Sequence, residues 1–456
     1  MTGDEPRTEG GAGAGAEAGV GAGAGAYSGA GVGEDRLPPG FALLGFFGAF
    51  AGAYFLSALL RAVTATLAPV FSAELGLKAA DLGLLAGAYF LGFSAMQLPL
   101  GRALDRFGPR RTLLSLLALA VIGCLAFARA DGLASLVVSR MLIGVGVSAG
   151  LMAPLTSYRR WLTPTAQLRA NSWMLMTGSL GMVASTLPVQ WLLPVAGWRG
   201  VFWGLAGLLA LAMVLVALFV PRDKPAAPAP GGPTAARQGG YREIVRHPLF
   251  IRTAPAGFFI YGGLIAVQSL WAGPWMTRVT GIDAGGAARG LFVVNLVMLF
   301  TFMTWGVVMP RLARRGFDAM RLMRLLLPLG LALLALNLWL GAAAGAWHWA
   351  VWCLACTVVT LSQPAVGAAF PTALAGRALS AFNLVIFAGV FAIQWGIGLL
   401  IDVAQALGAG EVGAFRAAFG VFAACSLASY LWLLGRTAAV ADNGRSLRRR
   451  SSSLET

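Results

Sequence analysis

Long stretches of apolar residues, separated by short polar segments, repeat along the chain from residue 41 to residue 434. Each stretch holds about 18–25 residues, and a helix of that length crosses the hydrocarbon core of a bilayer. The pattern therefore predicts an all-α membrane protein with twelve transmembrane helices. The expected spans are 41–67, 79–101, 112–129, 133–157, 171–192, 200–220, 253–276, 287–309, 323–342, 347–369, 379–402 and 414–434.

Segments of different composition lie outside these spans. Residues 1–40 are largely Gly/Ala repeats, and we expect this tail to be disordered. The stretch 221–252 is rich in Pro, Ala and Gly, which is typical of a linker. It separates two predicted six-helix bundles, 41–220 and 253–434, and a basic tail follows at 435–456.

The composition excludes a soluble domain. Of the 456 residues, 58% are hydrophobic and 11% are charged, and the mean hydropathy is +0.75. A soluble domain needs a polar surface and cannot bury that much apolar material.

The net charge of +16 has a topological explanation. If both termini are cytoplasmic, 26 of the 34 Lys and Arg residues fall in predicted cytoplasmic segments and six in periplasmic loops. An excess of basic residues in short cytoplasmic loops fixes the orientation of a membrane protein. We therefore expect a multi-pass protein of the cell inner membrane, surrounded by lipid, with both termini in the cytoplasm and no nucleic acid partner.

The two predicted bundles contain weak repeats at matching positions. The segment after the second span, 101–111, has a leading Gly and basic spacing similar to those of 306–316, after the eighth span. The sixth span opens with Trp-Arg-Gly-Val-Phe at 198–202, and the twelfth with Phe-Arg-Ala-Ala-Phe at 415–419. A duplicated six-helix unit would give such offsets, so the bundles should be related by a pseudo-two-fold axis.

Residues 101–111 read Gly-Arg-Ala-Leu-Asp-Arg-Phe-Gly-Pro-Arg-Arg. This segment resembles G-x-x-x-D-R-x-G-x-R-R, the signature of the loop between helices two and three in the major facilitator superfamily. The resemblance implies a secondary transporter in which this loop helps to latch the outward-facing state. Asp105 would pair with basic groups or with a helix N-terminus of the other half, and Gly101 would allow a sharp turn at a helix end. The implied switch residues are Gly101, Asp105, Arg106, Gly108, Arg110 and Arg111.

A finer resemblance lies in the first and fourth spans. Residues 140–161 are similar to the R-x-x-x-G-x-G-E-G…P…W pattern of the anion:cation symporter branch. Residues 60–69 resemble that branch's D-R-x-N-L-x-x-A-x-P stretch, and they also resemble the corresponding segment of organophosphate exchangers, which holds an arginine. Two positions depart from the symporter pattern, because Leu60 replaces an Asp and Val147 replaces a Glu. The resemblance implies an anionic substrate.

Arg61 and Arg140 are the charged residues within the predicted spans, away from their ends. A charge inside a bilayer costs several kcal/mol, so such a residue is a candidate for function. The planar guanidinium stays charged and suits a carboxylate or phosphate. Tyr54, Ser57 and Thr64 share a helix face with Arg61. We predict that Arg61, Arg140, Tyr54 and Ser57 bind substrate, although Arg140 could instead brace helices through backbone carbonyls.

The second bundle offers polar and aromatic side chains but no charge. They lie on the predicted seventh and eleventh helices, and they are Tyr261, Gln268, Trp271, Trp275, Asn383 and Gln394. Gly273 and Pro274 would be able to break the seventh helix. The residues assigned to the substrate site are Tyr261, Gln268, Trp271 and Asn383, with packing between helices as the alternative for each.

Sequence features of enzymes, ATP-driven pumps and metal sites are missing. No Asp or Glu lies in the middle of a predicted span, and the linker has no G-x-x-x-x-G-K-[ST] segment. The spans hold no Ser/His or Asp/His/Cys set that would support catalysis. Cys353 and Cys356 form a C-x-x-C without a second ligand pair, whereas structural zinc needs about four ligands. We expect no enzymatic activity, no cofactor and no metal.

The sequence thus predicts a monomeric transporter of a small organic anion, such as a carboxylate, that works by alternating access of two bundles. An exporter of neutral or cationic amphiphiles is one alternative, but residues 178–188 lack the G-x-x-x-G-P-x-x-G-G signature of drug–proton antiporters. A receptor or scaffold on the same fold is another. Because Leu60 and Val147 cannot titrate, we expect anion exchange or uniport rather than proton symport.

Overall fold

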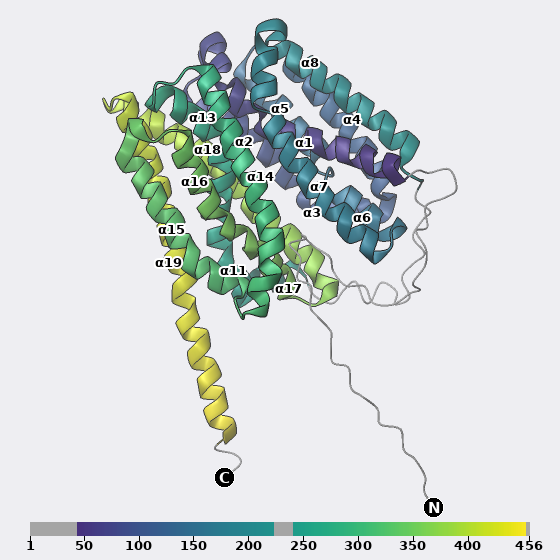
Figure 1. Ribbon diagram of the computed structural model, residues 1–456, viewed down its shortest axis with the longest axis vertical. Helices are drawn as coiled ribbons and strands as arrows, with labels where there is room; N and C mark the ends of the chain where they lie inside the picture. Colours follow the sequence, from purple (N-terminus) through teal and green to yellow (C-terminus); the bar gives the residue numbers. More distant parts are fainter. Residues whose placement is uncertain (1–42, 223–239, 453–456) are drawn as a thin grey trace, which may run out of the picture.

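The computed structural model describes residues 43–222 and 240–452, and every regular element within these ranges is a helix. The predicted tail 1–40 lies outside the described residues, as does 223–239 of the predicted linker. Ten helical segments are long and apolar enough to cross a membrane, and one bent pair adds an eleventh. Figure 1 shows the helices of the two halves as two neighbouring groups. The predicted all-α membrane fold is confirmed.

The N-terminal half follows most of the predicted spans, with two of them divided. Its helices are α1 (Leu43–Leu75), α2 (Ala79–Ala95), α3 (Gln97–Phe107), α4 (Pro109–Ala128), α5 (Leu133–Val147), α6 (Met152–Trp161), α7 (Pro164–Ala184) and α8 (Leu187–Phe219). The chain bends by 46° between α2 and α3, which together form the second span. A short turn at 148–151 separates α5 from α6 within the fourth span.

The fifth and sixth spans differ from the prediction. A helix was expected at 171–192, but α7 ends at Ala184 and the next residues belong to α8. The Thr163 side chain caps α7, and a proline at its first position favours the start there. Within α8 the chain turns at Gly197, where φ is +62°, a conformation that glycine adopts without strain. Apolar content alone did not locate this turn.

α7 has the length of a membrane span, 21 residues, but it is more polar than the other spans. Gln167, Arg169 and Asn171 lie in its first half. Added to the eleven segments above, α7 completes the expected arrangement of twelve spans.

The C-terminal half contains longer and more irregular helices. They are α10 (Tyr241–Arg246), α11 (Pro248–Ala256), η1 (Gly257–Tyr261), α12 (Gly262–Ala266), η2 (Val267–Trp271), α13 (Ala272–Pro274), η3 (Trp275–Val279), α14 (Ala284–Arg314), α15 (Ala319–Leu340), η4 (Gly341–Ala343), α16 (Ala346–Cys356), η5 (Thr357–Leu361), α17 (Ser362–Ala368), α18 (Thr372–Ala406) and α19 (Glu411–Ser452). α19 continues beyond residue 434, where the twelfth span was expected to end.

The last part of the predicted linker, 221–252, is helical. α10 and α11 bury the apolar side chains of Ile244 and Phe250. Phe250 packs edge-on against Phe382 of α18, with ring centroids 5.9 Å apart. Burial of these side chains therefore anchors the end of the linker to the C-terminal half.

The seventh span, 248–279, is continuous rather than broken at Gly273 and Pro274. It contains three π-helical segments, η1, η2 and η3, which alternate with α-helix. Pro255 and Pro274 have no backbone N–H to donate, and π turns accommodate such interruptions by local widening. Wider turns of this kind are common at functional sites.

The two ends of the molecule differ. We call the end that holds α11 and α17 the linker end (lower in Figure 1), and the opposite end, where α1 stops and α2 begins, the far end. Towards the far end α2 and α18 pack backbone against backbone. A Cβ atom added to Gly83 would lie 2.3 Å from the Gln394 carbonyl oxygen, and one added to Gly398 would lie 2.3 Å from that of Ala79. The two halves therefore meet without space for a side chain there.

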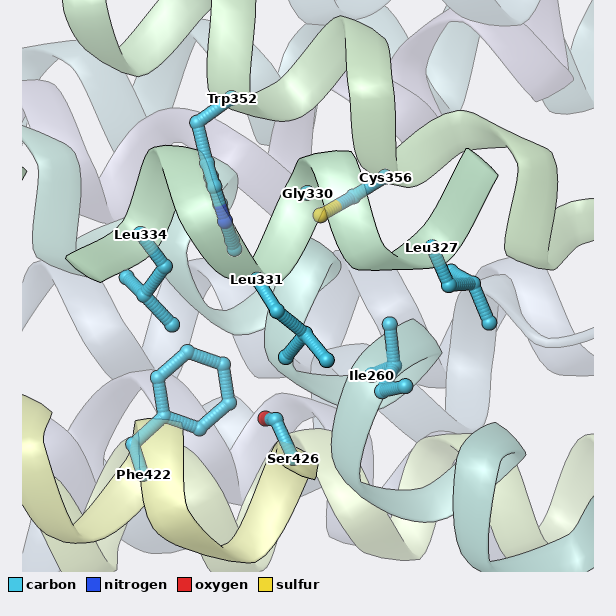
Figure 2. A pocket seen from close by; sticks show the side chains of 9 residues that line it. All are labelled: Ile260, Leu327, Gly330, Leu331, Leu334, Trp352, Cys356, Phe422 and Ser426. Carbon is cyan, nitrogen blue, oxygen red and sulfur yellow. The ribbon is translucent and has the colours of Figure 1, made fainter. Parts of the chain in front are cut away.

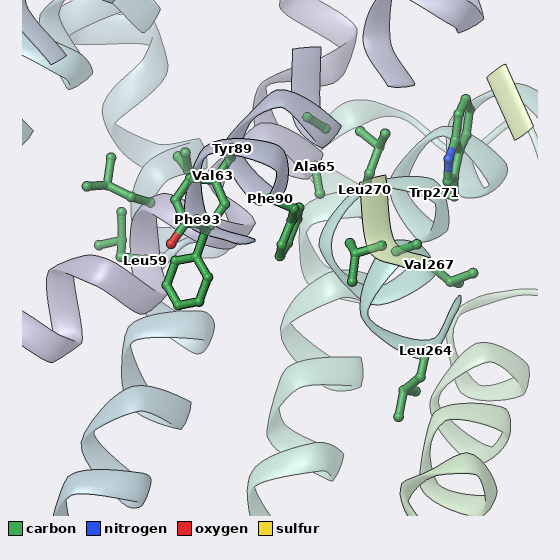
Figure 3. Close-up of a cluster of buried hydrophobic side chains, with 14 of the residues drawn as sticks. Leu59, Val63, Ala65, Tyr89, Phe90, Phe93, Leu264, Val267, Leu270 and Trp271 are labelled. Atoms are coloured by element: carbon green, nitrogen blue, oxygen red, sulfur yellow. The ribbon is translucent and has the colours of Figure 1, made fainter. Parts of the chain in front are cut away.

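A buried apolar cluster continues from one half into the other (Figure 3). The figure labels Val63 on α1 and Phe90 on α2 in the same cluster as Leu264 and Leu270 of the seventh span. Each of these side chains is nearly inaccessible to solvent. The cluster therefore supports the walls of the space between the halves.

Candidate substrate-binding site

A cavity of about 620 Å³ lies between the two halves. This volume falls within the range of about 300–1,000 Å³ that is usual for small-molecule sites. Both halves contribute to the lining, which includes α1, α2 and α7 on one side and the seventh span, α14 and α18 on the other. Six predicted site residues line it, namely Tyr54, Ser57, Arg61, Tyr261, Gln268 and Asn383. Two others, Arg140 and Trp271, do not.

Arg61 is the one charged side chain in the lining formed by the described residues. Its guanidinium lies near the hydroxyl-bearing rings of Tyr54, Tyr89 and Tyr261, and 5.7 Å from the centroid of the Phe93 ring. Its Nε is buried and has no hydrogen-bond partner within the described residues. No carboxylate of the described residues forms an ion pair with it. Arg61 is thus a cation without a counterion at the junction of the two halves.

The face of α1 predicted from the sequence points partly into the cavity. Tyr54, Ser57 and Arg61 line it, whereas Thr64, one turn farther on, is buried outside it. The Ser57 hydroxyl donates a hydrogen bond to the Val147 carbonyl oxygen at 3.3 Å. α5 therefore holds this part of α1 in place.

Arg140 holds α1 from the other side and is fully buried. Its Nη1 donates to the Leu60 carbonyl oxygen at 3.0 Å, and its Nη2 donates to the Thr64 hydroxyl at 2.5 Å. The guanidinium also lies 5.3 Å from the centroid of the Tyr89 ring. The Tyr89 hydroxyl in turn donates to the Ser57 carbonyl oxygen at 3.2 Å. Arg140 thus braces α1 through one backbone carbonyl and one hydroxyl, which agrees with the bracing role weighed as its alternative.

Side-chain amides make up the polar wall of the C-terminal half. Gln268 donates to the Asn295 side-chain oxygen at 2.9 Å, and Asn295 donates to the Leu291 carbonyl oxygen at 2.9 Å. Gln363 donates to the Asn383 side-chain oxygen. Sequence reasoning missed Asn295 and Gln363. Asn295 had a recognisable signal, because it is a polar residue in the middle of the apolar span 287–309.

Aromatic side chains from both halves meet beside Arg61. Phe93 of α2 and Phe387 of α18 line the cavity, and their ring centroids are 4.7 Å apart in an edge-to-face pair. Phe387 also stacks on Phe90 at 6.1 Å. Sequence reasoning did not select these residues, because a phenylalanine in an apolar helix carries no local signal that distinguishes a cavity from a core.

Three polar or aromatic side chains considered for the cavity belong instead to the core of the C-terminal half. The Trp271 indole donates to the Gln394 carbonyl oxygen at 3.1 Å, and the Gln394 side chain donates to the Ser269 hydroxyl at 3.0 Å. The Trp275 indole donates to the Ala344 carbonyl oxygen at 3.2 Å. These residues are fully or almost fully buried, so they pack the region between the cavity and the far end.

The implied switch segment lies at the linker end, on α3 and the start of α4. Gly101 is helical and exposed, and the turn expected there is made by Gly108, where φ is +79°. Asp105 and Arg106 are exposed, and no hydrogen bond or ion pair within the described residues involves Asp105. Arg110 donates to the Ala217 carbonyl oxygen at 2.5 Å, which joins α4 to α8 within one half. Arg111, at the start of α4, is exposed.

A second, much smaller void of about 10 Å³ lies within the C-terminal half (Figure 2). Its walls are almost entirely apolar, and Cys356 points into it between Leu327 and Gly330. The void has room for about one water molecule, so it is a packing defect rather than a second substrate site. Within the described residues no group of three or more His, Cys, Asp or Glu side chains is arranged to hold a metal ion.

Comparison with curated proteins gives partial matches to transporters of different substrates. The chain is 27% identical to a probable sulfoacetate transporter of Cupriavidus necator over 38% of this chain and 40% of that protein. It is 29% identical to a 4-hydroxybenzoate transporter of Acinetobacter baylyi over 36% of each chain. It is also 29% identical to a multidrug resistance protein B homolog of Mycobacterium tuberculosis, over 39% of this chain and 34% of that protein. The matched regions thus span two-fifths or less of these relatives.

Solved structures share the fold over most of the chain. A bacterial homolog of the human lysosomal transporter Spinster, in an inward-facing and unoccupied conformation, superposes with a TM-score of 0.68 and 17% identity, covering 85% of this chain and 95% of that one. A D-xylose–proton symporter gives 0.65 and 15%, covering 86% and 97%. The sequence profile of the Major Facilitator Superfamily matches residues 50–393, which is more than half of the chain, and the chain therefore belongs to this superfamily of transporters.

Proposed function

We propose that this protein transports a small organic anion across the membrane by alternating access, and that Arg61 binds the anion. The observation that carries this proposal is the position of Arg61, a cation without a carboxylate counterion among the described residues, in the cavity between the halves. A guanidinium in a site of low polarity attracts a carboxylate or sulfonate strongly, because little water competes for the charge. Tyr54 and Tyr261 provide hydroxyl groups near the same cation.

The names of two relatives support an anionic substrate. Sulfoacetate, which carries two ionised groups, and 4-hydroxybenzoate, which carries one, are both organic anions, and they are named for proteins that match this chain in part. The identity of 27–29% is too low, and the matched share too small, to transfer either substrate to this chain.

We assign the linker end to the cytoplasm and the protein to the inner membrane, as the basic loops predict. The cavity lining includes Met152 and Val307, which lie towards the linker end, whereas Asp402 joins the two halves at the far end. In this orientation the cavity faces inward. The similar Spinster homolog was solved in an inward-facing conformation, which supports the assignment.

An exporter of neutral or cationic amphiphiles is the second candidate, and one observation favours it. Five flexible methionines line the cavity, and methionine-rich surfaces adapt to varied apolar ligands. They are Met152, Met176, Met182, Met298 and Met303. A cationic drug would lie against Arg61, however, and like charges repel. A receptor or scaffold that moves no substrate is the third candidate.

Uptake into proteoliposomes tests the proposal and separates the three candidates. With a labelled organic anion as substrate, Arg61→Gln should abolish uptake, and Arg61→Lys should retain part of it, because a point charge replaces a planar fork. Arg321→Gln is the matched control, because this arginine is exposed at the start of α15 and does not line the cavity. Wild-type uptake by Arg61→Gln would overturn the anion site. Uptake of amphiphiles alone would favour the exporter, and no uptake of any solute would favour the receptor.

A further inference from the structure

We infer that the cavity selects monovalent anions whose remaining part is an apolar, ring-sized body, and that it discriminates against dianions. The inference rests on the proposed function and narrows its substrate class. Three features support it. One guanidinium is available to a ligand, the opposite wall is neutral, and a pair of aromatic rings lies beside Arg61.

Only one of the two arginines in the membrane interior is available to a ligand. Arg140 is fully buried, and two of its nitrogens donate to the Leu60 carbonyl oxygen and the Thr64 hydroxyl. Its ionisable neighbours are Tyr89 and Cys124, neither of which lines the cavity. A sequence with two such arginines would suit a phosphate or a dicarboxylate, but the described lining presents one guanidinium.

That single cation determines the net charge of the site when the two halves enclose a substrate. A monovalent anion at Arg61 forms a neutral pair, which the halves can enclose at low cost. A dianion would leave one negative charge in the membrane interior, and an unpaired buried charge costs several kcal/mol. Neutral ligands would leave Arg61 itself unpaired. A single ionised group on the substrate is therefore the favoured match.

The opposite wall cannot supply a second positive charge. Its polar groups are the amide pairs Gln268–Asn295 and Gln363–Asn383, which are neutral at every physiological pH. Amides donate and accept hydrogen bonds, so they tolerate a hydroxyl or carbonyl group on the substrate. They do not offset the cost of burying a second ionised group.

The carbon body of the substrate would lie against rings. Phe93 is next to the Arg61 guanidinium and forms an edge-to-face pair with Phe387 of the other half. A flat apolar body bound at Arg61 would contact both rings and thus both halves. Figure 3 shows the Phe93 ring extending away from α2, beside Phe90. A small ion such as acetate would neutralise Arg61 but would leave these rings without a contact.

Thermal-shift titration of the purified full-length protein with four probes tests the inference. The probes are benzoate, the dianion terephthalate, the neutral isostere benzamide, and acetate. Because a ligand stabilises the folded state by mass action, the midpoint shift reports affinity. Benzoate should bind at least about tenfold more tightly than each of the other three, a difference of about 1.4 kcal/mol.

Two variants test the role of the rings. Phe93→Leu and Phe387→Leu should each weaken benzoate by about tenfold and leave acetate unchanged, since they remove ring contacts and keep Arg61. Phe300→Leu is the control, because this ring is 58% exposed on the outer surface and does not line the cavity. If both variants lose the same benzoate affinity, misfolding at one position does not explain the loss.

The outcomes separate this inference from the proposed function. Tighter binding of terephthalate than of benzoate, lost in Arg61→Gln, would keep the anion site and overturn the monovalent selection. Equal binding of benzamide and benzoate would overturn the anion site itself. Acetate binding as tight as benzoate, or benzoate affinity unchanged in both phenylalanine variants, would overturn the apolar-body part. No shift with benzoate at millimolar concentration would overturn the inference as a whole.

Discussion

The Asp402 carboxylate accepts hydrogen bonds from the backbone N–H groups of Ala79 and Ala80, at 3.1 and 3.0 Å. Asp402 lies near the end of α18 in the C-terminal half, and the two alanines begin α2 in the N-terminal half. The first N–H groups of a helix have no partner within it, and a negative charge there is stabilised by the helix dipole. This contact therefore ties the far ends of the two halves together.

Asp402→Asn should shift the conformational equilibrium towards opening at the far end. The substitution removes the charge but keeps the shape, at a cost to the closed contact of about 1 kcal/mol, or about fivefold in population. Spin labels at Asp131→Cys and Leu407→Cys, on opposite halves, would report a longer distance. Asp283→Asn is the control, because Asp283 caps α14 within one half. Identical distance distributions in Asp402→Asn and its parent would contradict the role of the contact.

Arg140→Gln should lower thermal stability more than it lowers anion affinity. The variant leaves the Thr64 hydroxyl without its buried charged donor, and the cost should be about 2 kcal/mol. Anion affinity should fall by less than tenfold, since Arg61 remains. Arg169→Gln, at an exposed position of α7, is the control. Loss of anion binding as complete as in Arg61→Gln, without loss of stability, would place Arg140 in the binding site.

The contrast between Arg61 and Arg140 shows which part of the site can be predicted from the sequence. Both are charges in apolar helices, and that local signal selected both as candidates. Whether the Arg140 side chain enters the cavity depends on how closely α5 approaches α2. Residues far apart in the sequence determine that distance. A Cβ atom on Gly144 would lie 2.0 Å from the Tyr89 carbonyl oxygen, so only glycine allows this approach. The type of each residue taken alone does not reveal that Gly144 and Tyr89 are in contact.

The long apolar spans were predictable because bilayer thickness sets helix length. The turn at Gly197 and the divided fourth span were not, because apolar residues continue through both. Only one member of the amide pair Gln363–Asn383 was predicted from the sequence. Asn383 stood out on α18, whereas its partner is recognisable only once α17 lies beside α18.

Gly144→Ala should destabilise the protein and impair transport together. The added methyl group would push α2 away from α5, and the contacts of Tyr89 and Arg140 with α1 would be disturbed. Overpacking of this kind costs about 1–3 kcal/mol. Gly204→Ala is the matched control, because a Cβ atom at that helical position meets nothing within 4 Å. Equal thermal midpoints for the two variants would contradict the close packing of α2 and α5.

Cysteine labelling tests the orientation of the chain. Glu243→Cys, exposed on α10 at the linker end, should react with an impermeant thiol reagent only when the cytoplasmic side is accessible. Leu407→Cys, 84% exposed at the far end, should react from the periplasm. Both would be measured in spheroplasts and inverted vesicles. The reverse pattern would place the linker end outside and make the present state outward-facing.

Transport should proceed by anion exchange or uniport, without obligatory coupling to protons. A proton-coupled carrier needs a group that gains and loses a proton as the site opens alternately. The described lining contains no Asp, Glu, His or Lys, and a guanidinium keeps its proton. Asp81 and Asp402 lie near the ends of α2 and α18, where Asp81 accepts from the Lys78 N–H at the start of α2 and Asp402 accepts from the same helix end.

Proteoliposomes loaded with unlabelled benzoate should therefore take up labelled benzoate faster than empty ones, because an unpaired Arg61 is costly to enclose and a bound anion removes that cost. An inward proton gradient at zero membrane potential should not concentrate the anion by itself. Asp283→Asn serves as the control for carboxylates outside the contact between the halves. Concentrative uptake driven by the proton gradient alone, and lost in Asp402→Asn, would instead make the far-end contact the proton carrier.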